Sequence, residues 1–447
     1  MCNGPLLGKV LRFSLPLILS GILQLLYNAA DVAVVGRFAG KESLAAVGST
    51  GSLTNLMINL FIGLSIGASV VVARHIGAHD LKRAHDAVHT AAAISLVSGA
   101  ATLVIGVAFS KAFLTLMDTP SDVIDLSALY MRIYFLGMPA LMVYNFGSAI
   151  LRAMGDTMRP LYFLTISGII NVLLNLVFVC AFHMDVAGVA LATITSQYIS
   201  AVLVVICLLK LENCCHLDIK SIKFKKEFVV DMAKVGLPAG IQGSLFSVSN
   251  VLIQSSINSF GSTVMAANAA AANIEGFTYT SMNAISQASV TFTSQNVGAK
   301  KINRINRVAV VTLLTVTAVG LAMGSISFFA GESLLKIYSD EPAIIPYGLI
   351  RLKYICLPYF LCGVMEVLVG MLRGMICSTL PMIVSVFGSC VFRVMWIYTA
   401  FRASPTLETL YIAYTISWFL CCAVHFICFL IIKRRTAKKI LEQASIS

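Results

Sequence analysis

The sequence predicts an all-α polytopic membrane protein, with twelve transmembrane helices in two pseudo-symmetric six-helix bundles. Three observations lead to this fold class. Of the 447 residues, 58% are hydrophobic and only 12% are charged, a balance that does not fit a protein surrounded by water. Apolar stretches long enough to cross about 30 Å of hydrocarbon recur along the chain. The second half of the sequence also repeats motifs of the first half.

We read the apolar stretches as helices because they lack the alternation of apolar and polar residues that membrane β-strands require. The first stretch follows a short N-terminal segment, lacks a small-residue cleavage site and is longer than a signal peptide. We therefore expect it to remain in the mature protein. The twelve expected spans are residues 9–36, 44–73, 87–110, 122–149, 158–182, 187–210, 230–259, 265–296, 305–329, 343–371, 378–402 and 408–432.

The net charge of +12 indicates topology rather than nucleic-acid binding. If the N-terminus is inside, most Lys and Arg side chains fall in cytoplasmic loops, including five lysines from Lys210 to Lys226. A few, such as Lys111 and Lys336, fall in outer loops. By the positive-inside rule, we expect both termini in the cytoplasm and the chain in the inner (cell) membrane. We expect the lipid bilayer and a small molecule as partners, no nucleic acid, and a monomer.

Cysteines and histidines predict neither disulfides nor a metal centre. Most of the 12 cysteines lie inside apolar spans, where a thiol acts as a small buried hydrophobe. His75, His79, His85 and His89 crowd the loop after the second span at spacings that could hold a metal, but no nearby cysteine or carboxylate set completes a site. We expect a solvated cytoplasmic loop there, and no cofactor.

The internal repeat predicts the domain organisation. Six spans per repeat place both halves in the membrane with the same orientation, the parallel-repeat arrangement of some secondary transporters. We expect an N-terminal lobe at 1–210, a cytoplasmic linker at 211–228, and a C-terminal lobe with a cytoplasmic tail at 229–447. The matched segments are Phe13-Ser-Leu-Pro16 with Val235-Gly-Leu-Pro238, Ile76-Gly-Ala78 with Val297-Gly-Ala299, and Leu151-Arg-Ala-Met154 with Leu372-Arg-Gly-Met375.

Prolines stand at matched places within the expected helices, where proline removes a backbone hydrogen bond and permits a kink. Each of these four prolines has two alternative interpretations: a static bend that shapes packing, or a hinge that moves during a transport cycle. They are Pro16, Pro139, Pro238 and Pro358.

Several motifs resemble the multidrug and toxin extrusion (MATE) family of the MOP flippase superfamily. They are Tyr27-Asn-Ala-Ala-Asp31 ahead of Gly36, the loop from Gly77 to Ala84, the repeated Leu-Arg-Ala/Gly-Met, and Asn273-Ile-Glu-Gly-Phe277. The resemblance spans about residues 9–432. It implies a V-shaped antiporter that expels small amphiphilic or cationic organic compounds in exchange for H⁺ or Na⁺ by alternating access.

Few carboxylates lie well within the expected spans, and an ionisable group in hydrocarbon is a functional candidate. Asp31 lies in the outer part of the first helix, where it could bind a proton or sodium ion. The alternative is a surface aspartate on a helix that ends earlier. Asn171 and Asn175 stand one turn apart and share a helix face. They could be oxygen ligands or make hydrogen bonds between helices.

The resemblance implies a cation-coupling site in the first half. In related members, a tyrosine one turn before the aspartate, an asparagine and an acid on the fifth helix, and a sixth-helix threonine form this site. One position departs from the pattern because an asparagine replaces the acid, which leaves one carboxylate and the choice between H⁺ and Na⁺ open. The corresponding residues are Tyr27, Asp31, Asn171, Asn175 and Thr193.

The second half does not match the NorM-like members, whose acids lie on the seventh and tenth helices. Glu366 is about one turn from the expected tenth-helix position. Glu275 begins a polar stripe at four-residue steps, which we expect to face the substrate cavity or neighbouring helices. Because Arg393 has a similar depth to Glu275, we expect those two to form an ion pair. The polar stripe that begins at Glu275 continues with Tyr279, Asn283 and Gln287.

Three other functional classes are alternatives to an antiporter. A membrane-embedded enzyme would need a nucleophile and base or a metal cluster within the spans, and a directly ATP-driven pump would need a phosphate-binding glycine loop. Neither pattern occurs in the sequence. A lipid or lipid-linked oligosaccharide flippase of the same superfamily is the stronger alternative. It would favour a basic cavity and often fourteen spans, whereas the sequence predicts twelve spans and acids among them.

Overall fold

The computed structural model describes residues 1–116, 123–338 and 341–446, although the side chains of 39–49, 52, 53, 56 and 443–446 are outside the description. Residue 122, the predicted start of the fourth span, also lies outside the described residues. Throughout the described ranges the chain is almost entirely helical and contains no strand. Every predicted span corresponds to a helix or a consecutive set of helical segments.

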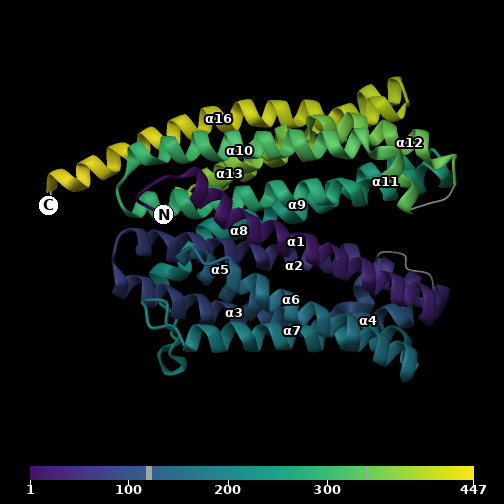
Figure 1. Cartoon of the computed structure of the whole chain (residues 1–447), viewed down its shortest axis with the longest axis horizontal. Helices are drawn as coiled ribbons and strands as arrows, with labels where there is room; N and C mark the ends of the chain where they lie inside the picture. The colour runs from purple at the N-terminus through teal and green to yellow at the C-terminus, as the bar shows by residue number, and fades with distance from the viewer. Residues whose placement is uncertain (117–122, 339–340, 447) are drawn as a thin grey trace. The chain divides into compact units, whose positions relative to one another are not determined.

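The first half contains seven α-helices and two π-helical segments (Figure 1). The π-helical segments are Val35–Ala39, which continues α1, and Leu176–Ala181, which continues α6. The α-helices are α1 (Leu7–Val34), α2 (Gly40–Gly77), α3 (Leu81–Leu116), α4 (Ile124–Leu136), α5 (Met138–Met154), α6 (Met158–Asn175) and α7 (Asp185–Leu209).

The second half follows a linker that contains the short 3₁₀ helix Ile219–Ser221. Its α-helices are α8 (Lys226–Asn258), α9 (Ser262–Gly298), α10 (Ile302–Phe329), α11 (Gly331–Tyr338), α12 (Ile344–Arg351), α13 (Phe360–Gly374), α14 (Thr379–Ser385), α15 (Phe392–Trp396) and α16 (Leu407–Ile446). Between them lie π-helical segments at Leu352–Cys356, Val386–Val391 and Ile397–Phe401 and the 3₁₀ helix Leu357–Tyr359.

Length and apolarity confirm the predicted membrane fold. Within the described residues, nine helices are long and apolar enough to cross a membrane. The pair α4 and α5, bent by 45°, makes a tenth. The remaining two predicted spans are α8 and α9, with 33 and 37 residues. They are long enough at about 1.5 Å per residue but too rich in Ser, Thr, Asn and Gln to pass as apolar. The result is the predicted twelve-helix membrane fold.

The chain divides into two compact units, one of residues 19–240 and one of residues 1–18 with 241–447. Two helices are therefore shared between the units. The division falls after Ile18 in α1 and after Gly240 in α8, and in each helix a repeat-related proline, Pro16 or Pro238, lies two residues earlier. The lobe boundaries at 211–228 that the repeat suggests remain a prediction.

In the unit of residues 19–240, α5 packs against α2, α3 and α7. The first part of α8 lies on α2 through glycines on both helices. A Cβ atom added to Gly63 would be 2.3 Å from the backbone nitrogen of Gly240, and one added to Gly67 would be 2.2 Å from the Met232 carbonyl oxygen. This contact is the small-residue packing through which membrane helices approach closely.

In the other unit, α9 packs against α10 and α13, and α13 packs against α16. The first part of α1 belongs to this unit. Phe13 meets the Phe292 ring edge-on at 5.8 Å between centroids, and Val10 is fully buried in the same cluster as Ala288. Both chain termini lie at the same end of this unit (Figure 1), as an even number of spans between them requires.

The backbone repeats itself at the helix ends. His79 and Lys300 end the repeated Gly-Ala segments with positive φ angles of 56° and 58°, and Gly155 and Ile376 end the repeated Leu-Arg-Ala/Gly-Met segments with 100° and 59°. Asp80 N–H donates to the His75 carbonyl at 3.1 Å, as a left-handed helix cap requires. The second half repeats this bond between Lys301 and Asn296 at 2.9 Å, so the sequence repeat is also a structural one.

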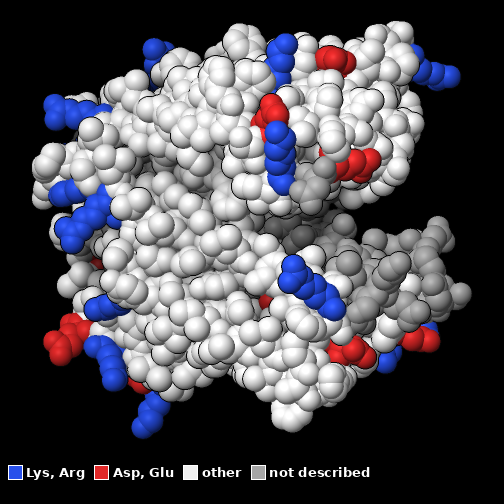
Figure 2. All heavy atoms as spheres, turned by 45° about the vertical axis from the view of Figure 1, so that its right-hand side comes forward, with Lys and Arg blue, Asp and Glu red and all other residues white. Residues whose placement is uncertain are grey.

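The surface is suited to lipid. Figure 2 shows a face on which most visible atoms belong to neither acidic nor basic residues. Large apolar side chains on the outward faces of the helices are exposed, among them Val104 on α3, Ile169 on α6, Leu314 on α10 and Phe419 on α16. Exposed apolar side chains along helices of this length indicate a bilayer rather than water as the solvent.

Candidate functional site

Asp31 contacts Asn175, one of the two α6 asparagines, within the unit of residues 19–240. Asn175 Nδ2 donates a hydrogen bond to Asp31 Oδ1 and lies 3.4 Å from Asn171 Oδ1. Asn175 is fully buried and Asn171 nearly so, whereas Asp31 is half-buried. The four-residue spacing on α6 thus places the Asn171 amide next to that of Asn175, which contacts the carboxylate. Asp31 is not a surface residue on a shortened helix.

The Asp31 site contains an unused acceptor and lacks a counter-cation. Asn175 Oδ1 is buried and finds no hydrogen-bond partner among the described residues. No Lys, Arg or His of the described part forms an ion pair with Asp31. The α6 helix also widens to a π-helix directly after Asn175, and such widenings recur at functional sites. These oxygens could bind a proton or a small cation.

Tyr27 and Thr193 do not complete this site in the structure. The Tyr27 hydroxyl donates to the Thr165 carbonyl at 3.3 Å, and the Thr193 hydroxyl donates to the Val189 carbonyl at 2.9 Å. The Tyr27 ring covers Gly168, where an added Cβ atom would be 1.8 Å from the ring. Tyr27 therefore packs α1 against α6. A direct role of either hydroxyl in cation binding remains a prediction.

Glu275 has a different partner from the one predicted. Its Oε2 lies 2.6 Å from Arg351 Nη2, and both side chains are about nine-tenths buried, with 13% and 9% exposed. The predicted pair of Glu275 with Arg393 is therefore wrong. Depth in the membrane does not identify which arginine pairs with Glu275. Arg351 also lies within the predicted span 343–371. The presence of a second arginine inside an apolar span was the sequence signal that could have indicated Arg351 as the partner of Glu275.

Asn268 joins this ion pair between α9 and α12 to two other helices, α16 and α8. Its Oδ1 accepts from Arg351 Nη1 at 2.5 Å and from the Tyr411 hydroxyl at 3.1 Å. Its Nδ2 donates to Gln254 Oε1 at 3.0 Å, and Arg351 also lies over the Tyr411 ring, 5.5 Å from its centre. Asn268 and Glu275 are seven residues apart, so both face α12 from the same side of α9.

Arg393 is held by neutral groups instead of a carboxylate. Its Nε donates to Ser417 Oγ at 3.0 Å, and its guanidinium lies 4.1 Å and 5.7 Å from the ring centres of Tyr414 and Trp418. Aromatic faces attract a desolvated guanidinium. The cation–π contacts explain how a side chain that is only 4% exposed remains buried without an acid.

The other polar residues predicted in the second half form none of the hydrogen bonds of the Glu275–Arg351–Asn268 network described above. Tyr279 is exposed, and Gln287 Nε2 donates to Asn283 Oδ1 at 2.9 Å. Glu366 is half-buried on α13, close enough to Arg373 for their charges to interact, while Arg373 Nη2 donates to Gln242 Oε1 at 3.0 Å. A contact of these side chains with substrate remains a prediction.

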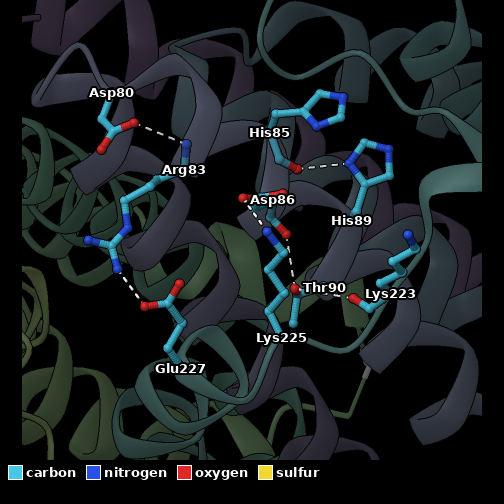
Figure 3. Close-up of polar contacts among 9 residues, drawn as sticks. All are labelled: Asp80, Arg83, His85, Asp86, His89, Thr90, Lys223, Lys225 and Glu227. Atoms are coloured by element: carbon cyan, nitrogen blue, oxygen red, sulfur yellow. Dashed lines mark hydrogen bonds and ion pairs between the residues drawn. The ribbon is translucent and has the colours of Figure 1, made fainter.

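The histidines after the second span bind the linker. His89 is buried, its Nδ1 donates to the His85 carbonyl at 2.8 Å, and its Nε2 accepts from Asp218 N–H at 2.9 Å (Figure 3 shows the first contact). The expected solvated position of His89 is therefore wrong. Asp218 also accepts from the Ser221 hydroxyl and Lys220 N–H, and these bonds lower the pKa of its carboxyl.

Charged pairs attach the start of α8 and the residue before it to the first turns of α3 (Figure 3). Arg83 Nη2 lies 2.5 Å from Glu227 Oε2, and Lys225 Nζ lies 2.6 Å from Asp86 Oδ2. Arg304, the repeat counterpart of Arg83, instead donates to the carbonyls of Met1 and Gly4. In each half, this arginine holds the segment that leads into the first helix of the other half.

The comparison with known families decides the identity of the chain. The model of the MatE family matches residues 16–177 and 238–399, once in each half and together well over half of the chain. The chain belongs to this family. MATE proteins are transporters and not enzymes, so the predicted fold and transporter class are confirmed.

Two relatives of this MATE protein show the same relationship over most of the chain. The probable multidrug resistance protein YoeA of Bacillus subtilis is 28% identical over 383 residues, covering 84% of this chain and 82% of YoeA. The multidrug export protein MepA of Staphylococcus haemolyticus is 21% identical over 365 residues, covering 82% and 80%. The solved structure of an outward-facing multidrug resistance MATE family transporter shares the fold, with a TM-score of 0.89, 22% identity and 96% coverage of both chains.

Proposed function

We propose that this MATE transporter is a secondary active antiporter that exports small amphiphilic or cationic organic compounds in exchange for H⁺ or Na⁺. Asp31 is the coupling carboxylate in this proposal. One observation carries it. The half-buried carboxylate of Asp31 is contacted by a neutral amide and has no counter-cation in the described structure. Burying a charge without compensation is costly, so an ionised Asp31 favours uptake of an external cation.

The neighbouring amides support the same role. Asn171 and Asn175 provide oxygen ligands, and the buried Asn175 Oδ1 has no hydrogen-bond partner among the described residues. A proton on Asp31 or a sodium ion between these oxygens would neutralise the site and satisfy that oxygen. Tyr27 and Thr193 would join the site only through a change in their present hydrogen bonds.

The substrate face is proposed to include the polar stripe of α9. Tyr279 is exposed, and Asn283 and Gln287 are half-buried, so organic molecules can reach these side chains. Glu366 on α13 would add a negative charge suited to cationic compounds. We also propose a monomer with both termini in the cytoplasm, because most of the 32 Lys and Arg lie in loops at the side of the termini.

Dye efflux tests the antiport mechanism. The measurement follows a fluorescent cationic dye in everted membrane vesicles that contain the chain, under separately imposed proton and sodium gradients. We expect one of the gradients to drive dye against its concentration gradient, and the Asp31→Asn variant to lose this response. Dye movement that ignores both gradients would contradict antiport. Transport of a fluorescent lipid analogue instead of dye would favour a flippase.

A further inference from the structure

We propose that the second unit contains a cation site that the chain fills with its own guanidinium, that of Arg351. The oxygen atoms that surround it belong to Glu275, Asn268 and Tyr411. The consequence for transport rests on the proposed antiport. Since Arg351 occupies the site of the second unit, binding of H⁺ or Na⁺ at Asp31 alone drives transport. Arg351 thereby determines which unit takes part in ion exchange.

The geometry around Arg351 is that of a cation surrounded by oxygen ligands. The carboxylate of Glu275 lies 2.6 Å from Nη2, and the amide oxygen of Asn268 lies 2.5 Å from Nη1. The Tyr411 hydroxyl bonds to that same amide oxygen, and its ring lies under the guanidinium. Carboxylate, amide and hydroxyl oxygens are also the ligands that hard cations prefer.

The position of the ligands does not depend on Arg351 alone. Asn268 Nδ2 donates to Gln254 Oε1, which fixes the amide so that its oxygen points toward the arginine. Gln254 is in turn held by its bond to Asn258 Oδ1 at 2.9 Å. Removing the guanidinium would therefore leave a buried carboxylate and an oriented amide oxygen around a vacated volume.

The structure places Arg351 where the charge can be held rigidly. It is the last residue of α12, and the chain continues directly into the π-helix Leu352–Cys356. Its Nε is buried and finds no acceptor within the described residues, so Glu275 and Asn268 carry its hydrogen bonds. An exchangeable cation would have to compete with the Arg351 guanidinium, which is covalently attached to the chain at this site. In the wild-type protein the site therefore takes up no ion.

Ion binding to purified protein tests this proposal without any transport measurement. All variants carry Asp31→Asn, which removes the proposed site of the first unit. Equilibrium binding of ²²Na⁺ and the thermal midpoint in detergent are measured in NaCl against choline chloride, at several pH values. We expect no Glu275-dependent binding in the Asp31→Asn protein. Addition of Arg351→Met should create one saturable site, seen as bound Na⁺ or as stabilisation by acid.

Two further variants serve as controls. Arg351→Lys keeps a tethered cation and should bind no ion, while Glu275→Gln with Arg351→Met removes both charges and should lose the new site. Glu275-dependent ion binding with Arg351 in place would overturn the proposal. A folded Arg351→Met variant that responds to neither Na⁺ nor acid would do the same.

The folding behaviour of Arg351→Met is itself informative. If the variant folds only in Na⁺ or at low pH, an external cation has replaced the guanidinium, as proposed. If Arg351→Met fails to fold in every salt and at every pH, a small cation cannot substitute for the guanidinium and the proposal is wrong. This holds whether or not the Glu275→Gln, Arg351→Met variant, which lacks both charges, folds. Retention of ion-driven efflux by Asp31→Asn would contradict the proposed coupling role of Asp31 but would leave these binding results unaffected.

Discussion

Asp31 and Glu275 are partly buried acids in repeat-related halves of one chain, but their partners differ. Asp31 meets the neutral amide of Asn175, whereas Glu275 meets the guanidinium of Arg351, which also donates a hydrogen bond to Asn268. In the proposed antiport the first carboxylate takes up an external cation, whereas the second already has an internal one. Sequence symmetry therefore does not imply that both halves exchange ions, because a single arginine changes the charge of one site.

The comparison predicts the largest effect for Asp31→Asn. Cation-driven dye efflux should fall by two or more orders of magnitude, because an amide can neither bind a proton nor neutralise a sodium ion. Thermal stability should change little, since Asn175 keeps a hydrogen-bonding neighbour of the same shape. Uphill transport equal to that of the wild type would show that Asp31 is not the coupling group.

The next effect concerns the stability of the Glu275–Arg351 pair. Either Glu275→Gln or Arg351→Gln leaves an uncompensated buried charge and should destabilise the protein by about 3–5 kcal/mol. The double variant should lose clearly less than the sum of both. Thermal unfolding in detergent provides the four corners of the cycle.

Arg393→Gln is the matched control for this cycle. Because Arg393 contacts Ser417, Tyr414 and Trp418 rather than Glu275, its loss should add to that of Glu275→Gln without coupling. Strong coupling of Glu275 with Arg393, and additivity with Arg351, would reverse the assignment of the pair.

An intermediate effect is expected for Asn175→Asp, which places a second carboxylate beside Asp31. Two acids in contact should hold a cation more tightly or share a proton, so the sodium or pH dependence of efflux should shift by about tenfold in ion concentration. Efflux measured over a series of Na⁺ concentrations and pH values reports this shift. An identical dependence in both proteins would place Asn175 outside the coupling site.

The smallest effect is expected for Tyr411→Phe. This change removes one donor to Asn268 but keeps the ring under Arg351, so stability should fall by about 0.5–1.5 kcal/mol. Asp31-dependent transport should be unaffected. A loss as large as that of Arg351→Gln, measured by the same unfolding experiment, would mean that the hydroxyl and not the ion pair holds the network.

The fold was predictable because its main determinant is local. Stretches of about 20 apolar residues can do little but span a bilayer, and even the polar helices α8 and α9 were found from their length between loops. The one-turn spacing on α6 predicted that Asn171 and Asn175 share a helix face, and the family resemblance implied that they lie in one site with Asp31. The partner of Glu275 was not predicted, because pairing across helices depends on rotation and register, which depth along a helix does not specify.

His89 shows the same limit on a smaller scale. The sequence groups it with the histidines of a polar turn, whereas in the structure it is buried and accepts the Asp218 N–H of the linker at Nε2. Left-handed backbone at Ile376 is another tertiary outcome, since a β-branched residue disfavours it while the repeat-related Gly155 adopts it freely.

The division of α1 and α8 between the two units has a consequence for biogenesis. During synthesis, Val10 and Phe13 emerge first, yet their packing partners Ala288 and Phe292 emerge only after more than half of the chain. The glycine face of α2 must likewise wait for Gly236 and Gly240. Neither half can complete its packing while the ribosome is still translating the linker. Each six-helix half produced alone should therefore be an incomplete folding unit that the quality-control proteases of the membrane degrade.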